Sequence, residues 1–263
     1  MKALVTGASS GIGRDIAKEL AKRNIDLILV SRDLDKLEEV KKQIQNVQVN
    51  VISKDLSIEK NCLDLYEEVK NEKVDILINN AGFGVFGEFV ETSLEKELNM
   101  IKTNLVAMHI LTKLFLQEMK KQDKGYILNV ASIAGYMPGP LMAAYYSSKA
   151  YVVRLTQAIK EELKHNKSKV KVGVLCPGPV NTNFNNVANV KFKAKSLSSE
   201  YVAKYTVNKI LKNKFYIVPG LQIKAVRFFA KIIPDNLMAK MAYKVQTRKF
   251  LSKCWTFCEN LVK

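Results

Sequence analysis

Long hydrophobic runs are missing from this sequence, and so are clusters of metal-binding side chains. No stretch approaches the ~18 consecutive apolar residues of a membrane-spanning helix. The two histidines, His109 and His165, stand alone in the sequence. Cys254 and Cys258 share one predicted helical face, but no other Cys or His cluster supplies two further zinc ligands. We therefore expect no metal site, and we expect the four cysteines to be reduced thiols in apolar surroundings.

Acidic residues are also scarce, and their scarcity is uneven. The chain holds 42 Lys and Arg against 25 Asp and Glu, a net charge of +17. Residues 190–263 account for 16 of these basic residues and only 3 of the acidic ones. Such an end indicates attraction to an anionic partner, which could be a cofactor phosphate, an acyl carrier, a membrane surface or nucleic acid. Alternatively, the lysines simply solvate the surface. No recognised nucleic-acid-binding motif occurs there, so we expect no nucleic-acid partner.

Short apolar runs alternate with amphipathic helical patterns along most of the 263 residues. Strands are predicted at 3–5, 26–30, 47–52, 74–79, 125–130, 170–176 and 215–218, and helices at 11–23, 34–45, 58–71, 95–122, 143–165 and 198–212. This alternation predicts an α/β fold, namely a three-layer, doubly wound (Rossmann) parallel sheet of seven strands with a C-terminal helical extension. Because the first strand follows Met1 directly, we expect no signal peptide and a cytoplasmic protein.

A glycine-rich turn connects the first predicted strand to the first predicted helix. Gly7, Gly11 and Gly13 are its glycines. In this context the backbone N–H groups approach a pyrophosphate at the positive end of the helix. The turn therefore predicts a dinucleotide site.

The second predicted strand ends in Ser31 and Arg32, where cofactor choice is made. An acidic residue here would hydrogen-bond the ribose 2′-OH and repel a 2′-phosphate. A hydroxyl and a guanidinium instead favour the phosphate, so we expect NADP(H) rather than NAD. Asp33 weakens this argument slightly, although it is better placed to cap the following helix.

Tyr145 and Lys149 lie one helical turn apart and share a helix face. A phenol with a pKa near ~10 exchanges protons readily once it is brought towards about 7. An ammonium at ~4 Å supplies roughly that much stabilisation at an effective dielectric of ~20. A Tyr–Lys pair alone is more often an exposed surface feature. Ser132, at the end of a buried strand where a substrate carbonyl would lie, favours the catalytic interpretation.

Taken together, these residues resemble the short-chain dehydrogenase/reductase family, over about residues 2–220, and its NADP-preferring branch in particular. By that resemblance Tyr145 is the general acid or base, Ser132 holds the substrate oxygen, Lys149 holds the nicotinamide ribose, and Asn104 keeps a water in a proton relay. The family's pattern implies the cofactor-binding residues Gly7, Ser9, Ser10, Gly11, Ile12, Gly13, Ser31, Arg32, Asp55, Leu56, Asn80, Ala81, Gly82, Tyr145, Lys149, Pro177, Gly178, Val180 and Thr182. Tyr146 occupies a position that is usually small in the family.

The resemblance also implies partners and an activity. We expect an NADPH-dependent carbonyl reductase or alcohol dehydrogenase acting on an apolar ketone or secondary alcohol, such as a 3-oxoacyl chain or a hydroxysteroid. The helices at 95–122 and 143–165 are the family's usual interfaces, so we expect a homodimer or homotetramer. An NADP-binding sensor that keeps the fold without catalysis is the alternative, as is a membrane-surface protein with little catalysis.

The end of the chain departs from the strand–helix alternation. We predict a catalytic domain at 1–220 with a substrate lid near 183–212, and a basic amphipathic helical extension of the same domain at 221–263. Lys224, Arg227 and Lys231 form a basic stripe on a helix predicted at 221–233, and a final helix follows Pro234, capped by Asp235 or Asn236. The extension could close the pocket, pack at an oligomer interface, or rest on an anionic membrane.

Overall fold

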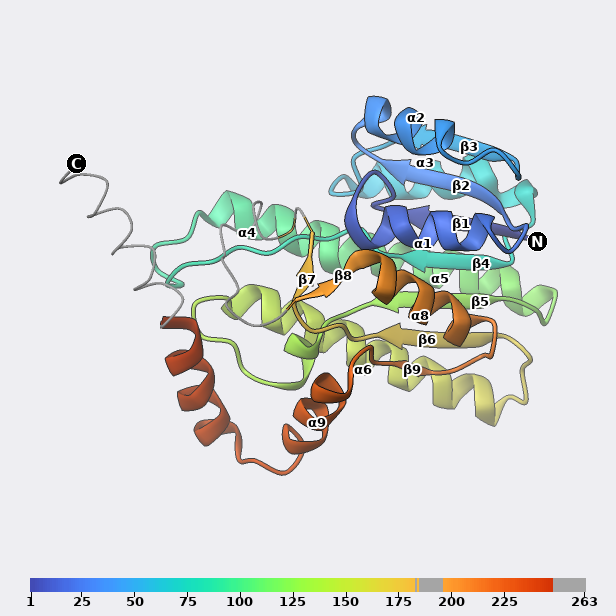
Figure 1. Cartoon of the computed structure of the whole chain (residues 1–263). Coiled ribbons are helices and arrows are strands. Elements are labelled where there is room, and N and C mark those ends of the chain that lie inside the picture. Colours follow the sequence, from blue (N-terminus) through green and yellow to red (C-terminus); the bar gives the residue numbers. More distant parts are fainter. Residues whose placement is uncertain (183, 185–195, 248–263) are drawn as a thin grey trace, which may run out of the picture.

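A seven-stranded parallel sheet forms the centre of the molecule. The computed structural model describes residues 1–182, 184 and 196–247. The sheet order is β3-β2-β1-β4-β5-β6-β9, and every pair is parallel (Figure 1). Its strands are β1 (Lys2–Thr6), β2 (Asp26–Ser31), β3 (Val49–Ser53), β4 (Ile76–Asn79), β5 (Tyr126–Val130), β6 (Lys171–Leu175) and β9 (Tyr216–Ile217). All seven predicted strands are confirmed, with ends that differ by one or two residues. The strand order reverses between β1 and β4, which opens a ligand crevice at the carboxyl ends of the strands.

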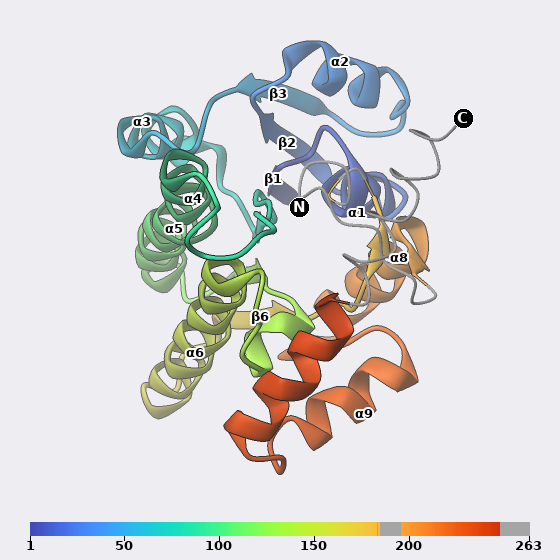
Figure 2. The same ribbon diagram turned by 90° about the vertical axis from the view of Figure 1, so that its left-hand side faces the viewer.

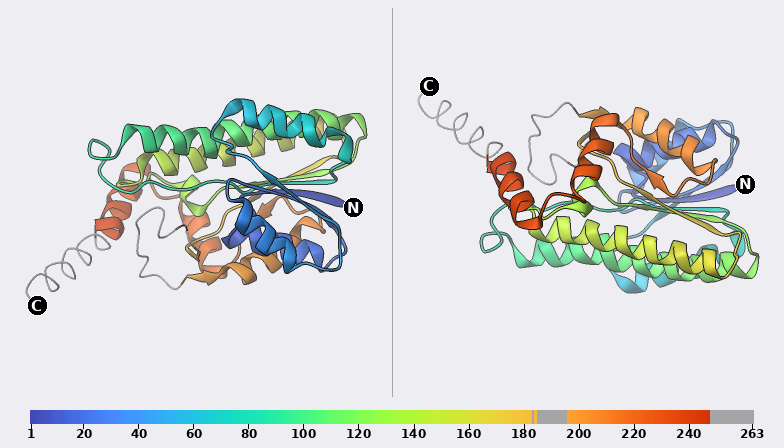
Figure 3. Two further views of the ribbon diagram at one scale, coloured as in Figure 1. Left: turned by 90° about the horizontal axis from the view of Figure 1, so that it is seen from above. Right: turned by 90° about the horizontal axis from the view of Figure 1, so that it is seen from below.

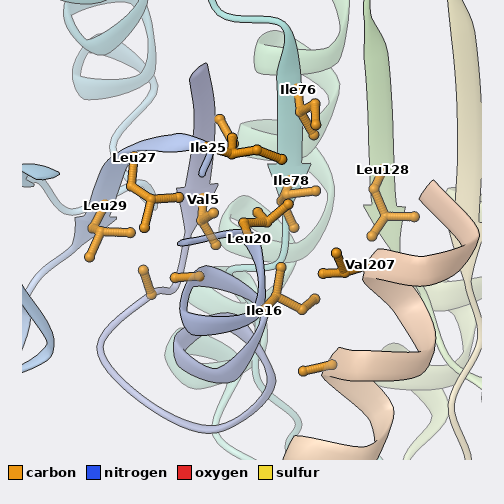
Figure 4. Packing of buried hydrophobic residues seen from close by; sticks show 14 of the residues in the cluster. Val5, Ile16, Leu20, Ile25, Leu27, Leu29, Ile76, Ile78, Leu128 and Val207 are labelled. Atoms are coloured by element: carbon orange, nitrogen blue, oxygen red, sulfur yellow. The ribbon is translucent and has the colours of Figure 1, made fainter. Parts of the chain in front are cut away.

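Helices cover both faces of this sheet, which makes three layers (Figure 3). One layer holds α1 (Gly11–Ala21), α2 (Leu34–Lys42) and α8 (Ser199–Ile210), and the other holds α3 (Glu59–Val69), α5 (Met108–Lys121) and α6 (Ala143–His165). Ile16 and Leu20 of α1 meet Val207 of α8 over the first face (Figure 4). Because both faces are buried, the strands are apolar on both sides, as parallel sheets require.

The long helix predicted at 95–122 is interrupted. It consists of α4 (Leu94–Ile101), a π-helical turn (Lys102–Ala107) and α5. A π-turn inserts a residue without ending the helix, so the apolar periodicity continues across it. Asn104, a predicted catalytic residue, lies in this turn.

The region predicted as a lid includes part of the core. Residues 199–210 form α8, which packs against α1, and the Ser199 hydroxyl donates a hydrogen bond to Asp15. A small two-stranded sheet, β7 (Val180–Asn181) and β8 (Leu197–Ser198), precedes α8. The rest of the predicted lid, at 183 and 185–195, lies outside the described residues.

Two helices follow β9 and lie beyond the carboxyl ends of the strands (Figures 1 and 2). The first, α9 (Leu221–Phe229), ends four residues before the predicted 233. Residues 235–247 form the second, which begins at Asp235, so Asp235 lies in its first turn and the predicted cap at Asp235 or Asn236 is wrong. Within the part of the chain that is described, no helix is long and apolar enough to cross a membrane.

Candidate active site

The glycine turn forms a tight cradle at the start of α1. Gly7 and Gly11 have φ angles of +63° and +54°, which side chains other than glycine rarely adopt. A Cβ on Gly13 would lie 2.3 Å from the Gly7 carbonyl oxygen. Ser10 precedes the helix with an extended backbone, and its side chain makes no capping hydrogen bond. The N–H groups at the positive end of α1 are thus open to an anionic ligand.

Asn80 braces this cradle from the neighbouring strand. Its side-chain amide donates hydrogen bonds to the carbonyl oxygens of Thr6 (3.0 Å) and Gly7 (3.2 Å). The Thr6 hydroxyl in turn accepts hydrogen bonds from the backbone N–H groups of Asn80 and Ala81. Sequence reasoning missed Thr6, and its only signal was a hydroxyl at the end of a buried strand.

The residues predicted to choose the cofactor lie at the ends of β2 and β3. The Arg32 side chain is 65% exposed, and its Nη1 atom lies 3.9 Å from a carboxylate oxygen of Asp55. Asp33 accepts a hydrogen bond from the Lys36 N–H, so its predicted capping role is confirmed. The Asp55 carboxylate also accepts hydrogen bonds from the backbone and side chain of Ser57, while the neighbouring Leu56 is buried.

Tyr145, Lys149 and Ser132 converge at the carboxyl end of β5. Tyr145 and Lys149 are both buried in α6. Lys149 Nζ donates a hydrogen bond to the Val130 carbonyl oxygen at 3.0 Å and lies 5.8 Å from the centroid of the Tyr145 ring. The two side chains share a face, as predicted, but the ammonium points towards the strand rather than to the phenol.

Burial governs the charge states of this pair. Burial raises the pKa of the Tyr145 phenol well above its usual value, although a hydrogen bond with Ser132 opposes the shift. Burial lowers the pKa of Lys149 to about 8, while Cys176 has a smaller opposite effect. Burial thus acts against the expected lowering of the Tyr145 pKa by Lys149, because apolar surroundings penalise both charged forms, and that lowering stays a prediction. Tyr145 remains protonated at neutral pH.

Asn104 ties the π-turn to the site. Its carboxamide oxygen accepts a hydrogen bond from the Phe83 N–H, and its amide group donates to the Phe83 carbonyl oxygen and to the Ser148 hydroxyl. A Cβ on Gly82 would lie 2.8 Å from the Asn104 carboxamide oxygen and 3.5 Å from Lys149 Nζ. The side chain thus holds two segments together, while the proton relay stays a prediction.

Apolar side chains surround the Tyr145 ring. Met100, Ala134 and Met142 are buried with it, and Phe184 lies 5.4 Å from it between ring centroids. Phe83, Val85, Phe86, Ala144 and Tyr146 pack around the same cluster. Apart from Tyr146 and Phe184, which lies in the predicted lid, sequence reasoning did not identify these residues, because nothing in their spacing reveals which loops meet. The surroundings suit an apolar substrate rather than a polar one.

The segment after β6 connects this cluster to the glycine turn. The Pro177 carbonyl oxygen accepts hydrogen bonds from the Ile133 N–H and the Ser132 hydroxyl. Val180 is buried, and a Cβ on Gly11 would lie 3.1 Å from the Thr182 side chain. A Cβ on Gly178 would lie 2.3 Å from Ile223 of α9. The predicted cofactor residues of this segment therefore lie between the cradle and Tyr145.

The C-terminal helix reaches the site through Tyr146. The side-chain amide of Gln246, which is 2% exposed, donates a hydrogen bond of 2.9 Å to the Tyr146 hydroxyl. A Cβ on Gly139 would collide with the Tyr146 ring. The large side chain at this position is thus accommodated by a glycine and anchors the helix at 235–247.

Arg227 does not belong to an exposed basic stripe. Its guanidinium lies 3.7 Å from the centroid of the Tyr216 ring and 5.2 Å from that of Tyr136. Cation–π stacking of this kind stabilises the contact of α9 with the body of the protein. The predicted stripe therefore loses its central member, and only Lys224 and Lys231 are left exposed on it.

Known proteins are similar to this chain in sequence. The chain is 34% identical to an uncharacterized oxidoreductase of Staphylococcus epidermidis over 183 residues, which cover 68% of this chain and 78% of the relative. It is 36% identical to the very-long-chain 3-oxoacyl-CoA reductase of Rattus norvegicus over 175 residues, but these cover only 54% of that protein and 62% of this chain.

Solved structures are similar to this chain in fold. A short-chain dehydrogenase from Sphingobium yanoikuyae in complex with NADPH superposes with a TM-score of 0.81 at 26% identity, covering 88% of this chain and 91% of the other. A short-chain dehydrogenase/reductase from Burkholderia phymatum in complex with NAD gives 0.79 at 26% identity, covering 86% and 91%. The family model for short chain dehydrogenases matches residues 1–191. With the glycine cradle, Ser132, Tyr145 and Lys149 in place, the chain belongs to the short-chain dehydrogenase family.

Proposed function

We propose that this protein reduces apolar ketones with NADPH, by using Tyr145 as the proton donor. The observation that carries the proposal is the convergence of Tyr145, Ser132 and Lys149 inside an apolar cluster at the carboxyl end of the sheet. A protonated phenol in a dry site donates its proton only where negative charge develops on a bound oxygen. A ketone that is being reduced develops that charge on its carbonyl oxygen.

The residues present fit a nicotinamide dinucleotide. The close packing at Gly7 and Gly13 admits no side chain, so the backbone N–H groups of this turn can approach a phosphate directly. The uncapped N-terminus of α1 attracts its negative charge. The exposed Arg32 guanidinium at the end of β2 suits a ribose 2′-phosphate, because it can bind two phosphate oxygens at once. We therefore propose NADP(H), and we note that solved relatives bind either NADPH or NAD.

Each catalytic side chain has a separate task in this proposal. A nicotinamide dinucleotide, held by the glycine cradle and Arg32, would supply the hydride for the carbonyl carbon. Ser132 holds the carbonyl oxygen, and Tyr145 donates the proton that completes the alcohol. Lys149, with its pKa lowered to about 8, exchanges protons near neutral pH and serves to reprotonate the site. Asn104 fixes the position of Phe83 and Ser148 beside it.

The apolar lining supports a lipophilic substrate, in the range of acyl chains or steroids. Met100 and Met142, both buried, and the partly buried Phe184 surround Tyr145 with apolar atoms, which favours a substrate without polar groups that would need partners. Methionine adapts to irregular shapes, which suits bulky substrates.

A panel of ketones and aldehydes tests the proposal. NADPH oxidation by the full-length protein is measured for each compound, with NADH in parallel and Tyr145→Phe as the control. We expect turnover of apolar ketones with NADPH, weaker turnover with NADH, and none with Tyr145→Phe. Tight NADPH binding without turnover of any compound would instead support a nucleotide sensor that keeps this fold.

A further inference from the structure

The helices beyond β9 expose an unusual amount of apolar surface. Apart from Met238, their large apolar side chains are at best partly covered, and many are about half exposed or more. We define the terminal surface by nine of them, namely Leu221, Val226, Phe228, Phe229, Ile232, Leu237, Met241, Tyr243 and Val245, whose exposed fractions run from 40% to 81%. Exposed apolar groups scattered singly are ordinary, but a concentration of this size within 25 residues marks an interaction surface.

Lysines accompany this terminal surface. Lys224, Lys231, Lys240 and Lys244 are all exposed and form no ion pair within the described residues. Asp235 is the only acidic residue in the sequence from 221 to 247. The surface is thus apolar and cationic, with almost no negative charge of its own.

The helix at 235–247 separates these two properties into stripes. Leu237, Met241 and Val245 recur every fourth residue and therefore lie along one face. Lys240 and Lys244 recur in the same way on the adjacent stripe. An apolar stripe flanked by lysines is the pattern of a helix lying in the interface of an anionic bilayer.

A second segment exposes apolar side chains at the same end of the molecule. Phe89 and Val90, in the segment joining β4 to α4, are 67% and 83% exposed, and Leu94 at the start of α4 is 70% exposed. Figures 1 and 3 show this segment and the helix at 235–247 at the same end of the protein, beyond the carboxyl ends of the strands. Lys149, which donates a hydrogen bond to Val130 at the end of β5, also lies at the carboxyl ends of the strands.

From these observations we propose that the terminal surface docks the protein onto an anionic lipid bilayer. The charge selects this occupant over a second copy of the chain. A twofold contact between two terminal surfaces would place the same lysines opposite one another without acidic partners. Anionic headgroups neutralise those lysines while the acyl boundary receives the Phe and Ile side chains. Arg227 takes no part, because it is held between Tyr136 and Tyr216.

Vesicle sedimentation tests the proposal without substrate or cofactor, so its outcome does not depend on the proposed reaction. Full-length protein is sedimented with vesicles of phosphatidylcholine and phosphatidylglycerol, and with vesicles of phosphatidylcholine alone. We expect binding to the anionic vesicles that is at least about tenfold stronger, and release as salt is added. Equal sedimentation with both vesicles, or sedimentation with neither, would overturn the proposal.

Two variants locate the contact. In the first, Lys224, Lys231, Lys240 and Lys244 are each changed to Gln, and we expect anionic-vesicle binding to fall at least roughly tenfold. Its matched control changes Lys42, Lys167, Lys169 and Lys171 to Gln. These four exposed lysines lie at the amino ends of the strands, away from the terminal surface. Equal loss in both variants would mean that net charge alone drives binding, and would overturn the proposal.

The second variant combines Phe228→Ser with Ile232→Ser, two side chains that are 60% and 62% exposed. We expect at least about tenfold weaker binding, because each side chain loses its apolar burial in the bilayer. Leu63→Ser with Leu211→Ser is the matched exposed control. Light scattering of the same samples gives the oligomeric state. If the Phe228/Ile232 variant is monomeric where the wild type is dimeric, and neither binds vesicles, the surface is a contact between two copies.

Discussion

Apolar residues are buried in the sheet and its helical layers, whereas many apolar residues of the C-terminal helices are exposed. In the sheet and its helical layers, apolar periodicity leads to burial, as in Leu4, Ile78 and Leu128, which are fully buried. In α9 and the helix at 235–247, a similar periodicity leaves Phe228 and Leu237 more than half exposed. The difference teaches that periodicity predicts helix formation in both regions, whereas burial depends on whether the partner surface belongs to the same chain.

The net charge also differs between the main part of the chain and its C-terminal part. Residues 1–189 hold 26 Lys and Arg against 22 Asp and Glu, while residues 190–263 hold 16 against 3. In the body, charges pair on the surface, as Lys60 does with Asp64. Up to residue 247, where the description of the extension ends, its four lysines Lys224, Lys231, Lys240 and Lys244 form no ion pair. We interpret the sheet with its helical layers as the catalytic part of the protein. We interpret the extension as the part that attaches it to a partner surface.

A change in the glycine cradle should have the largest effect, because it removes the cofactor site from the body. In Gly13→Ala the new Cβ would lie 2.3 Å from the Gly7 carbonyl oxygen and 2.4 Å from the Asn80 amide nitrogen. We expect NADPH affinity to fall by roughly two orders of magnitude or more, and the free energy of unfolding to fall by about 1–3 kcal/mol. NADPH fluorescence titration and urea unfolding measure the two. Ala225→Ser, at an exposed site on α9, serves as the control and should change neither.

Lys149→Met should separate stability from catalysis within the body. Burial lowers the pKa of Lys149 from 10.5 to about 8. Between these values the unfolded chain binds more protons than the native one, so the wild type gains stability as pH rises from about 8 to 10.5. Below pH 8 the buried charge of Lys149 destabilises the folded protein by a constant amount. This amount is at most about 3 kcal/mol, because the pKa is lowered by some 2.5.

Turnover should drop by about 10²–10⁴ in Lys149→Met. We expect the variant to be about 1–2 kcal/mol more stable than the wild type at pH 7, because it lacks the charge but also the hydrogen bond to Val130. That gain should vanish near pH 10.5. Urea unfolding of the variant and the wild type at both pH values measures this difference in the free energy of unfolding. If the variant is less stable relative to the wild type at pH 7 than at pH 10.5, the result contradicts the account.

The third prediction compares a buried polar group with an exposed apolar one. Asn129 is fully buried, accepts hydrogen bonds from Asn79 and Thr112, and donates one to Thr156. Asn129→Leu removes these three buried hydrogen bonds and should lower the free energy of unfolding by about 2–3 kcal/mol. Val245→Ser, in the extension, should change it by less than about 0.5 kcal/mol. Similar losses in thermal or urea unfolding would remove the distinction between the two regions.

The fourth prediction concerns cofactor choice and should have the smallest effect. Arg32→Ala removes the guanidinium proposed to bind the 2′-phosphate, while Lys36→Ala removes a nearby exposed cation that pairs with Asp33. We expect the KM for NADPH to rise roughly 10- to 100-fold in Arg32→Ala, with little change for NADH. Lys36→Ala should leave the ratio of the two KM values unchanged. Equal changes for both cofactors would indicate that Arg32 does not contact the 2′-phosphate.

The sequence was sufficient to predict the seven strands, because buried parallel strands are short apolar runs bounded by turns. It also placed Ser132, Tyr145 and Lys149 together, since two share a helix face and the third ends a strand. It could not predict the π-turn at Asn104, because one inserted residue leaves the apolar pattern intact.

Long-range contacts were equally hidden. Nothing near Arg227 indicates that Tyr136 and Tyr216 will hold it, and nothing near Gln246 indicates Tyr146, one hundred residues earlier. The burial that raises the pKa of Tyr145 was hidden for the same reason. Spacing gives the distance to Lys149 along a helix, whereas burial depends also on Met100 and Phe184, which come from other segments.

Turnover by Tyr145→Phe tests the central claim most directly. NADPH oxidation with an apolar ketone is measured for the wild type and the variant, and NADPH binding is titrated in the same samples. The account predicts that the variant binds NADPH like the wild type while its turnover falls to background, because only the phenolic hydroxyl, the proposed proton donor, has been removed. A variant that reduces the ketone at the wild-type rate would contradict the assignment of catalysis to this site.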